Sequence, residues 1–413
     1  MNNKIIKAKE ILKKYNQEHL LYFYNDLTND EKEILLNDIL DLDFDKILTL
    51  YTNSLKPNTP QYVISPLEHF EKEQLSNKLI NKYIKIGEKE LKKNTYAVVT
   101  MAGGQGSRLG YQGPKGTYEI KFNIGKKSLF ELACDTLKKA NNLYGITLFW
   151  YIMVSPENKK QTIDYFKQHN YFGYPKEYIT FFIQDTIPLI DVNGKIVLQD
   201  YYKIKEVSNG NGNVFKAMKK YNIITDMKKK NIKWVFFAGI DNILTKHVDP
   251  LFLGMTIDCK MQVGSKSIFK KDPLSNTAVY CRKNGKPAIL DYDEIDLNLS
   301  ETKDKNGAFV YREANVLAHL MNIKAIEYVS TKSLPYHRAY KKNPIINEEG
   351  TKIVPTSPNT FKFENFIFDS FSFFDNILLL RVKEEEEFAP IKDFTGMYTP
   401  ETAKEKYERY WKI

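Results

Sequence analysis

The sequence predicts an α/β fold: a doubly wound, mixed sheet with a helical region before it and a short tail after it. Apolar runs of strand length alternate with helix-length segments between residues 96 and 240. The first of these runs stops at a cluster of glycines, and the apolar period changes from helical to strand-like just before it. We therefore expect a mostly helical region at 1–92, an α/β domain at 93–383 and a short C-terminal segment at 384–413.

The first 92 residues have the pattern of helices. Thr28 and Glu31 have the spacing of a capping box and precede apolar residues at helical intervals, including Leu36 and Ile39. A proline-bearing stretch at 56–66 breaks the pattern, and a second helical run covers about 71–92.

Strands and helices then alternate along the chain. The expected strands lie at 97–101, 146–154, 178–183 and 233–240, and the expected helices at 128–142, 158–169 and 213–230. Such alternation favours a parallel sheet. Residues 260–300 have the character of antiparallel strands with a turn at Asn284-Gly285, which makes the sheet mixed. Further helices are expected at 308–322 and 400–411.

The composition excludes several classes of protein. Of the 413 residues, 42% are hydrophobic and 27% are charged, so the chain can bury a core and is not generally disordered. Three cysteines without a C-x-x-C pair favour neither a disulfide framework nor structural zinc. The N-terminus lacks the apolar stretch of a signal peptide, and no apolar run approaches the roughly 20 residues of a membrane span. We expect a soluble, cytoplasmic protein without membrane contacts.

The net charge of +10 raises the alternative of a nucleic-acid partner. Arginines are few, however, and the lysines are spread along the whole chain rather than clustered. We therefore expect no nucleic-acid partner, although a positive field would still attract small phosphorylated substrates.

Residues 101–116 form a glycine-rich segment directly after the first apolar run. Glycines let backbone N–H groups approach phosphate oxygens, and Arg108 and Lys115 add two cations. A Walker A loop is excluded because Lys115 lies between Pro114 and Gly116. A dinucleotide fingerprint is excluded because Leu109 stands where the third glycine is required. A glycine-rich turn without a ligand is the alternative.

The segments 103–110 and 114–116 resemble the signature loop of the UTP:sugar-1-phosphate uridylyltransferases, and most of all the eukaryotic-type UDP-N-acetylhexosamine pyrophosphorylases. The resemblance covers about residues 60–395 and recurs in separate blocks. It implies a Rossmann-like, nucleotidyltransferase (GT-A-like) fold for the domain at 93–383. It also implies a requirement for Mg²⁺ or Mn²⁺.

The resemblance assigns a nucleotide-binding role to several segments. Arg108 and Lys115 would contact the phosphates of UTP, and Gln184, at the end of the Phe181–Gln184 block, would read the uracil edge. The segment 209–213 resembles the family's Asp-Gly-Asn-Gly-Gly, with asparagine replacing its first and last residues. In the resemblance, the uracil and phosphates are held by the backbone of Met101, Ala102, Gly103 and Gly104. Gly210 would lie against the uracil and Asn211 against the sugar.

Further blocks imply metal and sugar contacts. Asp241, in a block that resembles the family's Val-Asp-Asn, is the candidate metal ligand. Asp291 and Asn315 would contact the sugar. Beside Asn315, Arg312 replaces the asparagine of the family's Asn-Ala-Gly-Asn and Ala314 replaces its glycine, and these changes leave the identity of the sugar open.

The last blocks supply cations. Lys392, in a segment that resembles the family's Glu-Phe-Ser-Pro-Leu-Lys, would reach the phosphates with Lys115, and Lys362 is a weaker candidate. The run Glu384–Glu387 has the composition of a solvated surface. The six histidines show no metal-ligand spacing, and we expect most of them to be packing or surface residues.

The implied reaction joins UTP and a sugar-1-phosphate into a UDP-sugar and pyrophosphate, with N-acetylglucosamine as the first choice of sugar. A UDP-glucose or UDP-galactose pyrophosphorylase of the same family is one alternative. A non-catalytic nucleotide-sugar binding protein is another. The chain after residue 393 is short compared with the eukaryotic members, so we expect a monomer. The sequence leaves open the direction of the reaction in the cell.

Overall fold

The structure is a computed structural model that describes residues 2–56, 62–272, 277–291, 294–295 and 297–413. The chain forms two compact units, each assembled from three separate stretches of sequence. The first unit comprises residues 1–60, 185–213 and 334–366, and the second comprises residues 61–184, 214–333 and 367–413. The domain borders expected near residues 92 and 383 stay a prediction. The two units are described separately below.

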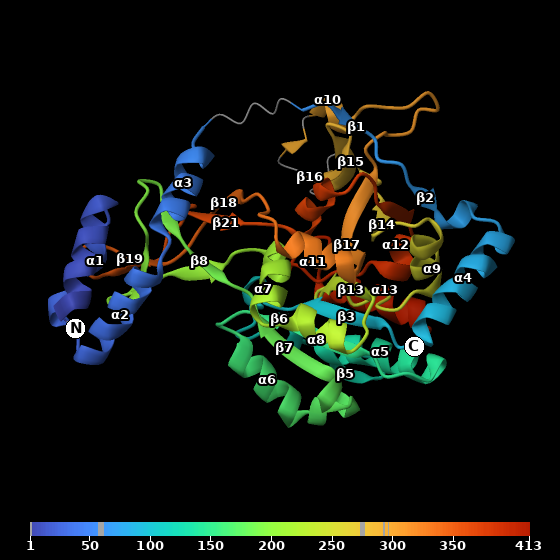
Figure 1. The fold of residues 1–413 in the computed structure, drawn as a ribbon, viewed down its shortest axis with the longest axis horizontal. Coiled ribbons are helices and arrows are strands. Elements are labelled where there is room, and N and C mark those ends of the chain that lie inside the picture. The colour runs from blue at the N-terminus through green and yellow to red at the C-terminus, as the bar shows by residue number, and fades with distance from the viewer. Residues whose placement is uncertain (1, 57–61, 273–276, 292–293, 296) are drawn as a thin grey trace. The chain divides into compact units, whose positions relative to one another are not determined.

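The second unit contains one large mixed sheet whose main path runs β2-β22-β14-β17-β13-β3-β6-β7 (Figure 1). Strands β13, β3, β6 and β7 pair in parallel, so their carboxyl ends meet at one edge of the sheet. Strand β17 is antiparallel to both β13 and β14, and β22 and β2 extend the sheet in parallel. The bounds are β2 (Phe70–Glu71), β3 (Tyr96–Met101), β6 (Phe149–Val154), β7 (Ile179–Ile183), β13 (Trp234–Gly239), β14 (Val263–Phe269), β17 (Glu313–Asn322) and β22 (Leu378–Arg381).

Helices cover both faces of this sheet. Val98 and Phe236 share an apolar cluster with side chains of α4, α5, α6 and α9. On the opposite face Phe237 packs against Phe215 of α7, and the Tyr151 hydroxyl donates a hydrogen bond to Asp226 of α8 at 2.7 Å. The bounds are α4 (Asn77–Leu91), α5 (Leu129–Tyr144), α6 (Lys159–Gln168), α7 (Val214–Lys220), α8 (Ile223–Lys229), α9 (Pro250–Asp258) and α11 (Ile323–Ser330), which packs on α7 and α8.

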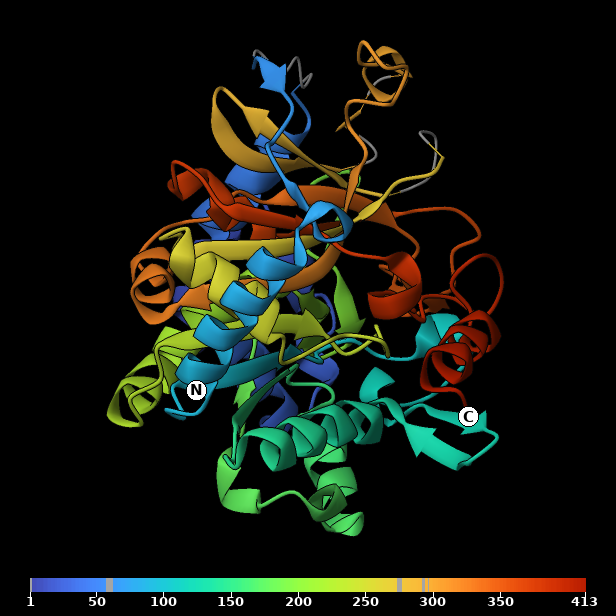
Figure 2. The same ribbon diagram turned by 90° about the vertical axis from the view of Figure 1, so that its right-hand side faces the viewer.

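Smaller elements complete the second unit. Strands β15 and β16 form an antiparallel hairpin whose turn residues Asn284 and Gly285 have φ values of 51° and 79°. Figure 2 shows α13 beside the β4–β5 hairpin, where the Asn123 N–H donates to Glu408 of α13 at 2.8 Å. The bounds are β1 (Ile64–Ser65), β4 (Glu119–Phe122), β5 (Gly125–Ser128), β15 (Val279–Lys283), β16 (Lys286–Leu290), α10 (Leu297–Ser300), α12 (Glu384–Glu387) and α13 (Pro400–Trp411).

The first unit combines three helices with short antiparallel strands around its own apolar cluster, which includes Leu36, Ile190 and Phe363. Its helix α2 begins at the predicted capping box, since Thr28 and Glu31 exchange backbone-to-side-chain hydrogen bonds. The bounds are α1 (Asn2–Lys14), α2 (Asn29–Asp41), α3 (Phe44–Ser54), β8 (Thr186–Pro188), β9 (Ile190–Asp191), β10 (Leu198–Asp200), β11 (Lys203–Ile204), β12 (Glu206–Ser208), β18 (His337–Lys341), β19 (Ile345–Ile346), β20 (Lys352–Ile353) and β21 (Thr360–Glu364).

The predicted fold class is confirmed, and two expected helices differ from the structure. The segment 308–322 contains the strand β17 instead of a helix, because pairing with β13 and β14 on both sides outweighs the helix propensity of its Ala, Leu and Met residues. The helix expected at 213–230 is two helices separated near Asn222, which has a φ of 56°. Part of the proline-bearing stretch, residues 57–61, lies outside the described residues. Among the described residues, no helix has the length and apolar character needed to cross a bilayer.

Candidate active site

The glycine-rich segment leaves the carboxyl end of β3 and closes on itself. The Gly106 N–H donates to the Gly113 carbonyl at 2.9 Å, and the Lys115 N–H donates to the Gly104 carbonyl at 3.0 Å. Lys115 therefore returns to the strand end from which the segment departs. This edge of a parallel sheet is where α/β folds bind their ligands.

Asn158 anchors the start of this segment from the neighbouring strand end. Its buried side-chain amide donates to the Ala102 carbonyl at 2.9 Å and to the Gly104 carbonyl at 3.3 Å. Its amide oxygen accepts the Ser155 N–H, just after β6, at 2.9 Å. The residue was not among the predicted site residues, and the Ser-x-x-Asn spacing after an apolar strand is the signal that indicates it.

Gly103 and Gln184 lie in direct contact across the strand ends. The Gln184 N–H donates to the Val154 carbonyl at 2.9 Å, which places the residue directly after β7 and beside β6. A Cβ on Gly103 would stand 2.2 Å from the Gln184 side-chain oxygen. A side chain at position 103 is therefore incompatible with the observed position of the Gln184 amide.

Asp241 follows β13 at the same edge and faces the returning loop. Its carboxylate lies 3.7 Å from the Lys115 ammonium, and the two side chains are 29% and 13% exposed. A Cβ on Gly239 would stand 2.6 Å from a carboxylate oxygen of Asp241, so the carboxylate folds back over the last residue of the strand. Among the described residues, no group of three or more His, Cys, Asp or Glu side chains is arranged to hold a metal ion.

The segment 387–394 approaches this edge from the far end of the chain. The Ile391 N–H donates to the Asp241 carbonyl at 2.9 Å, and the Phe394 N–H donates to the Arg108 carbonyl at 3.2 Å. The Arg108 guanidinium lies 3.5 Å from the Asp393 carboxylate. Lys392, whose ammonium lies 5.0 Å from the centre of the Tyr398 ring, is thus held between the Asp241 and Arg108 segments.

Asn242 fixes the beginning of segment 387–394. Its amide nitrogen donates to the Glu387 carbonyl and its amide oxygen accepts the Ala389 N–H, both at 2.8 Å. The Asn242 side chain thereby makes one donor and one acceptor contact with the backbone, as a neighbouring strand would. The sequence pattern predicted a role for Asp241 as a metal ligand, and it did not indicate that the neighbouring Asn242 fixes this segment.

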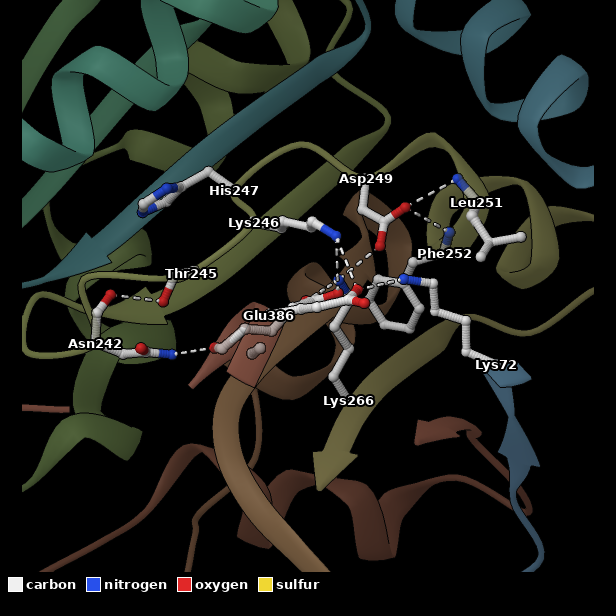
Figure 3. Close-up of polar contacts among 12 residues, drawn as sticks. Lys72, Asn242, Thr245, Lys246, His247, Asp249, Leu251, Phe252, Lys266 and Glu386 are labelled. Carbon is white, nitrogen blue, oxygen red and sulfur yellow. Dashed lines mark hydrogen bonds and ion pairs between the residues drawn. The ribbon is translucent and has the colours of Figure 1, made fainter. Parts of the chain in front are cut away.

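A buried ionic cluster beside Asn242 contacts the start of the same segment (Figure 3). The Lys266 ammonium, whose side chain is 1% exposed, lies 2.7 Å from an Asp249 oxygen and 2.5 Å from a Glu387 oxygen. Lys246 lies 3.5 Å from the other oxygen of Glu387, and Lys72 contacts Glu386 at 2.8 Å. The expectation that the acidic run is a solvated surface is therefore wrong for Glu387, which is 3% exposed.

Electrostatics stabilise this cluster in its ionised form. Burial alone would raise the pKa of Asp249, but the adjacent Lys266 ammonium holds that pKa down at about 2. Burial works to lower the pKa of Lys266, and the carboxylates of Asp249 and Glu387 outweigh it and raise that pKa. A lysine in the apolar strand Val263–Phe269 is the sequence signal for this cluster, and only the fold pairs it with residues 17 and 121 positions away.

The two candidate sugar contacts lie in the second unit. Asn315 is on β17, where its side-chain oxygen accepts the Leu317 N–H at 3.0 Å and lies 3.1 Å from the Tyr280 hydroxyl. Asp291 follows β16 and its carbonyl accepts the Glu294 N–H at 2.9 Å. The Arg312 guanidinium packs on the Phe269 ring at 5.8 Å.

The remaining candidates belong to the first unit. Gly210 has a φ of 95°, and a Cβ there would stand 2.2 Å from the Asn365 carbonyl oxygen, so only glycine fits without strain. Asn211 begins the short helical turn Asn211–Asn213. Lys362 on β21 pairs with Glu364 at 2.9 Å.

Comparisons with known proteins agree with this architecture. The family model described as UTP–glucose-1-phosphate uridylyltransferase matches residues 44–400. UDP-N-acetylglucosamine diphosphorylase 2 of Arabidopsis thaliana is 33% identical over 96% of this chain and 82% of its own length. UDP-N-acetylglucosamine pyrophosphorylase of Saccharomyces cerevisiae is 33% identical over 97% and 89%. The structure of the uridine diphosphate N-acetylglucosamine pyrophosphorylase from Trypanosoma brucei has a TM-score of 0.82 at 26% identity and covers 98% of this chain and 84% of its own.

Proposed function

Because the chain belongs to the UTP–glucose-1-phosphate uridylyltransferase family, we propose that it transfers the uridylyl group of UTP to a sugar-1-phosphate and releases pyrophosphate. The observation that carries the proposal is the meeting of three segments at one sheet edge. Lys115 of the glycine loop lies 3.7 Å from Asp241, and the Asp241 carbonyl accepts the N–H of Ile391, the residue before Lys392. The glycine loop and the segment that carries Lys392 thus meet at the edge where a phosphate group would lie, which supports a role for cations from distant parts of the chain.

The chemistry of the reaction matches this set of residues. The sugar phosphate has a second pKa near 6, so at neutral pH its oxygen is already ionised and attacks the α-phosphorus of UTP without a general base. The protein must hold two anions together in line and offset the charge that accumulates in the transition state. We assign that role to Lys115, Arg108 and Lys392, and we assign the uracil edge to Gln184.

The remaining assignments complete the substrate site. Gly103 and its neighbours in the loop would offer backbone N–H groups to the phosphates. Asp291 and Asn315 would contact the sugar, and Gly210 and Asn211 would contact the uracil and the sugar. Lys362 is kept as a further phosphate candidate.

A divalent cation fits the residues present. Mg²⁺ commonly takes one or two protein carboxylates and completes its shell with substrate phosphates and water. Asp241 offers one carboxylate, 29% exposed, at the sheet edge. We propose that Asp241 holds Mg²⁺ or Mn²⁺ together with the phosphates. The bound ion would neutralise phosphate charge during transfer.

N-acetylglucosamine-1-phosphate is the proposed acceptor. The curated relatives at 33% identity over more than 95% of this chain carry UDP-N-acetylglucosamine in their names, which supports it. Glucose-1-phosphate or galactose-1-phosphate is the second candidate, favoured by Arg312 in place of the family's asparagine. A cytoplasmic monomer without nucleic-acid contacts completes the proposal.

Pyrophosphate release from UTP and Mg²⁺, measured against a panel of sugar-1-phosphates, tests the function. ATP, CTP, GTP and dTTP serve as nucleotide controls. We expect release with UTP and the highest kcat/KM with N-acetylglucosamine-1-phosphate. Binding of UDP-sugars without any turnover would instead favour the non-catalytic alternative and refute the proposal.

A further inference from the structure

A chain of three buried polar side chains, those of Tyr280, Ser265 and His319, leads to the partly exposed Asn315. The hydroxyl of Tyr280 lies 3.1 Å from the Asn315 amide oxygen, and the hydroxyl of Ser265 lies 2.5 Å from that of Tyr280. The next contact, at 2.6 Å, joins Ser265 to Nδ1 of His319. Ser265, Tyr280 and His319 are at most 2% exposed, so water does not interrupt the chain.

The starting point of the chain is fixed by the backbone. Between Asn315 and His319 the register of β17 with β14 shifts, and Leu317 takes a φ of 54°. The Leu317 N–H points at the Asn315 side chain at 3.0 Å. Because a backbone N–H can only donate, the atom that faces it must be the amide oxygen.

The donor in each of the other hydrogen bonds of this side-chain network follows from that assignment. Two oxygens at hydrogen-bond distance need one proton between them, and the Asn315 oxygen has none, so Tyr280 donates to Asn315. The Lys266 carbonyl, 3.3 Å from the Tyr280 hydroxyl, is a longer second acceptor. Ser265, whose other acceptor is the Ala318 carbonyl at the longer distance of 3.5 Å, then donates to Tyr280, and His319 donates from Nδ1 to Ser265.

The environment of His319, at the other end of the hydrogen-bond network, agrees with donation from its Nδ1 atom. The His319 Nε2 atom is buried and has no hydrogen-bond partner among the described residues, as expected for the unprotonated nitrogen of this tautomer. The imidazole packs edge-on against the Phe371 ring at 5.1 Å. Burial lowers the pKa of His319 to about 3, so the imidazole stays neutral at ordinary pH.

We propose that Tyr280, Ser265 and His319 are positioning residues that fix the Asn315 amide with its NH₂ group presented to the sugar. The two donors on the oxygen prevent the amide from flipping, and the amide nitrogen has no partner within the described part of the chain. Asn315 therefore offers a donor, and the matching atom of the sugar is an acceptor, either a hydroxyl oxygen or an acetamido carbonyl. This inference rests on the proposed function and adds three residues to its site.

Tyr280→Phe tests the proposal, because it removes the hydroxyl and keeps the ring. We expect the KM for the sugar-1-phosphate to rise about tenfold, with the KM for UTP changed less than about twofold. Ser265→Ala, one step farther from Asn315, should raise the KM for the sugar-1-phosphate by about two- to threefold. Tyr174→Phe is the matched control, since its buried hydroxyl donates to the Leu148 carbonyl at 2.7 Å, next to the amino end of β6.

A second background separates positioning from a general loss of stability. In an Asn315→Ala protein the Tyr280→Phe change should have no further effect on the KM for the sugar-1-phosphate. An unchanged sugar KM in Tyr280→Phe, an equal rise in both KM values, or a full effect in the Asn315→Ala background would overturn the proposal. These outcomes are distinguishable from failure of the proposed function, in which the wild-type protein itself releases no pyrophosphate.

Discussion

Replacing Gly103 by alanine should weaken UTP binding by moving Gln184. The added Cβ would stand 2.2 Å from the Gln184 side-chain oxygen and 2.8 Å from its amide carbon. Ordinary contact begins at 3.4 Å, so the oxygen must retreat by about 1.2 Å. A hydrogen bond of about 2.9 Å to the uracil edge does not survive such a displacement.

The magnitude follows from the hydrogen bonds that are lost. One or two buried hydrogen bonds left unmade cost about 1–3 kcal/mol, which corresponds to a rise in the KM for UTP of about 5- to 150-fold. The clash falls on the far end of the Gln184 side chain, whereas the nearest backbone atom, Ser155 N, would stand 3.4 Å from the added Cβ, which is an ordinary contact. The melting temperature of the Gly103→Ala protein should therefore stay close to that of the wild type.

A double-mutant cycle identifies the cause. Steady-state pyrophosphate release at varied UTP would be measured for Gly103→Ala, Gln184→Ala and the double variant. If the methyl group acts through Gln184, alanine at position 103 has no further effect once Gln184 is alanine. Additive losses in the double variant, or a normal KM for UTP in Gly103→Ala, would refute the assignment of Gln184 to the uracil.

Three further outcomes are expected. Lys115→Ala or Arg108→Ala should lower kcat by about 10²-fold through the loss of about 3 kcal/mol of electrostatic stabilisation. Lys121→Ala, at an exposed position, is the charge-matched control. Unchanged turnover in a folded Lys115→Ala protein would contradict the assignment. Gly210→Ala should lower the free energy of unfolding by about 2 kcal/mol or more in denaturant titrations, because a Cβ there meets the Asn365 backbone at 2.2 Å. Gly285→Ala is the control, since Gly285 has a φ of 79° but open space around it, and it should cost less. Equal costs for the two variants would show that the contact with Asn365 is irrelevant. Burial lowers the pKa of His247 to about 4, below the value near 6.5 in the unfolded chain, so the unfolded state binds the proton first. The free energy of unfolding should therefore fall by about 3 kcal/mol as the pH falls from about 6.5 to 4. His247→Gln should reduce this dependence of stability on pH, and an unaltered dependence would be evidence against a buried neutral imidazole.

The parallel strands and the glycine loop were predictable because both follow from local pattern. The apolar run at 97–101 and the glycines after it indicate a buried strand that ends at a ligand-binding edge, and the structure has β3 at that place. The confirmed strands β6, β7 and β13 carry the same kind of signal. Their alternation with helices is sufficient to predict a parallel arrangement.

The support beneath the site could not be predicted in the same way. Lys266 and Glu387 are charged residues that composition assigns to the surface, and only the folded chain shows that each neutralises the other in the interior. The strand β17 was missed because its residues favour a helix when isolated, while its two neighbours in the sheet determine its structure. Asn242 acts through the backbone groups of residues 387 and 389, which carry no sequence signal, and for Asn158 only the Ser-x-x-Asn spacing was available.

The two hydrogen bonds of Asn242 determine how precisely Lys392 is positioned along its segment. They hold the Glu387 carbonyl and the Ala389 N–H at once, so the segment cannot slide past Asn242 without losing both. A slip of one position would exchange the ammonium of Lys392 for the carboxylate of Asp393 or the apolar side chain of Ile391. One amide therefore decides whether a positive, a negative or a neutral residue follows the one that is bonded to the Asp241 carbonyl, with an alignment normally obtained only from a full strand.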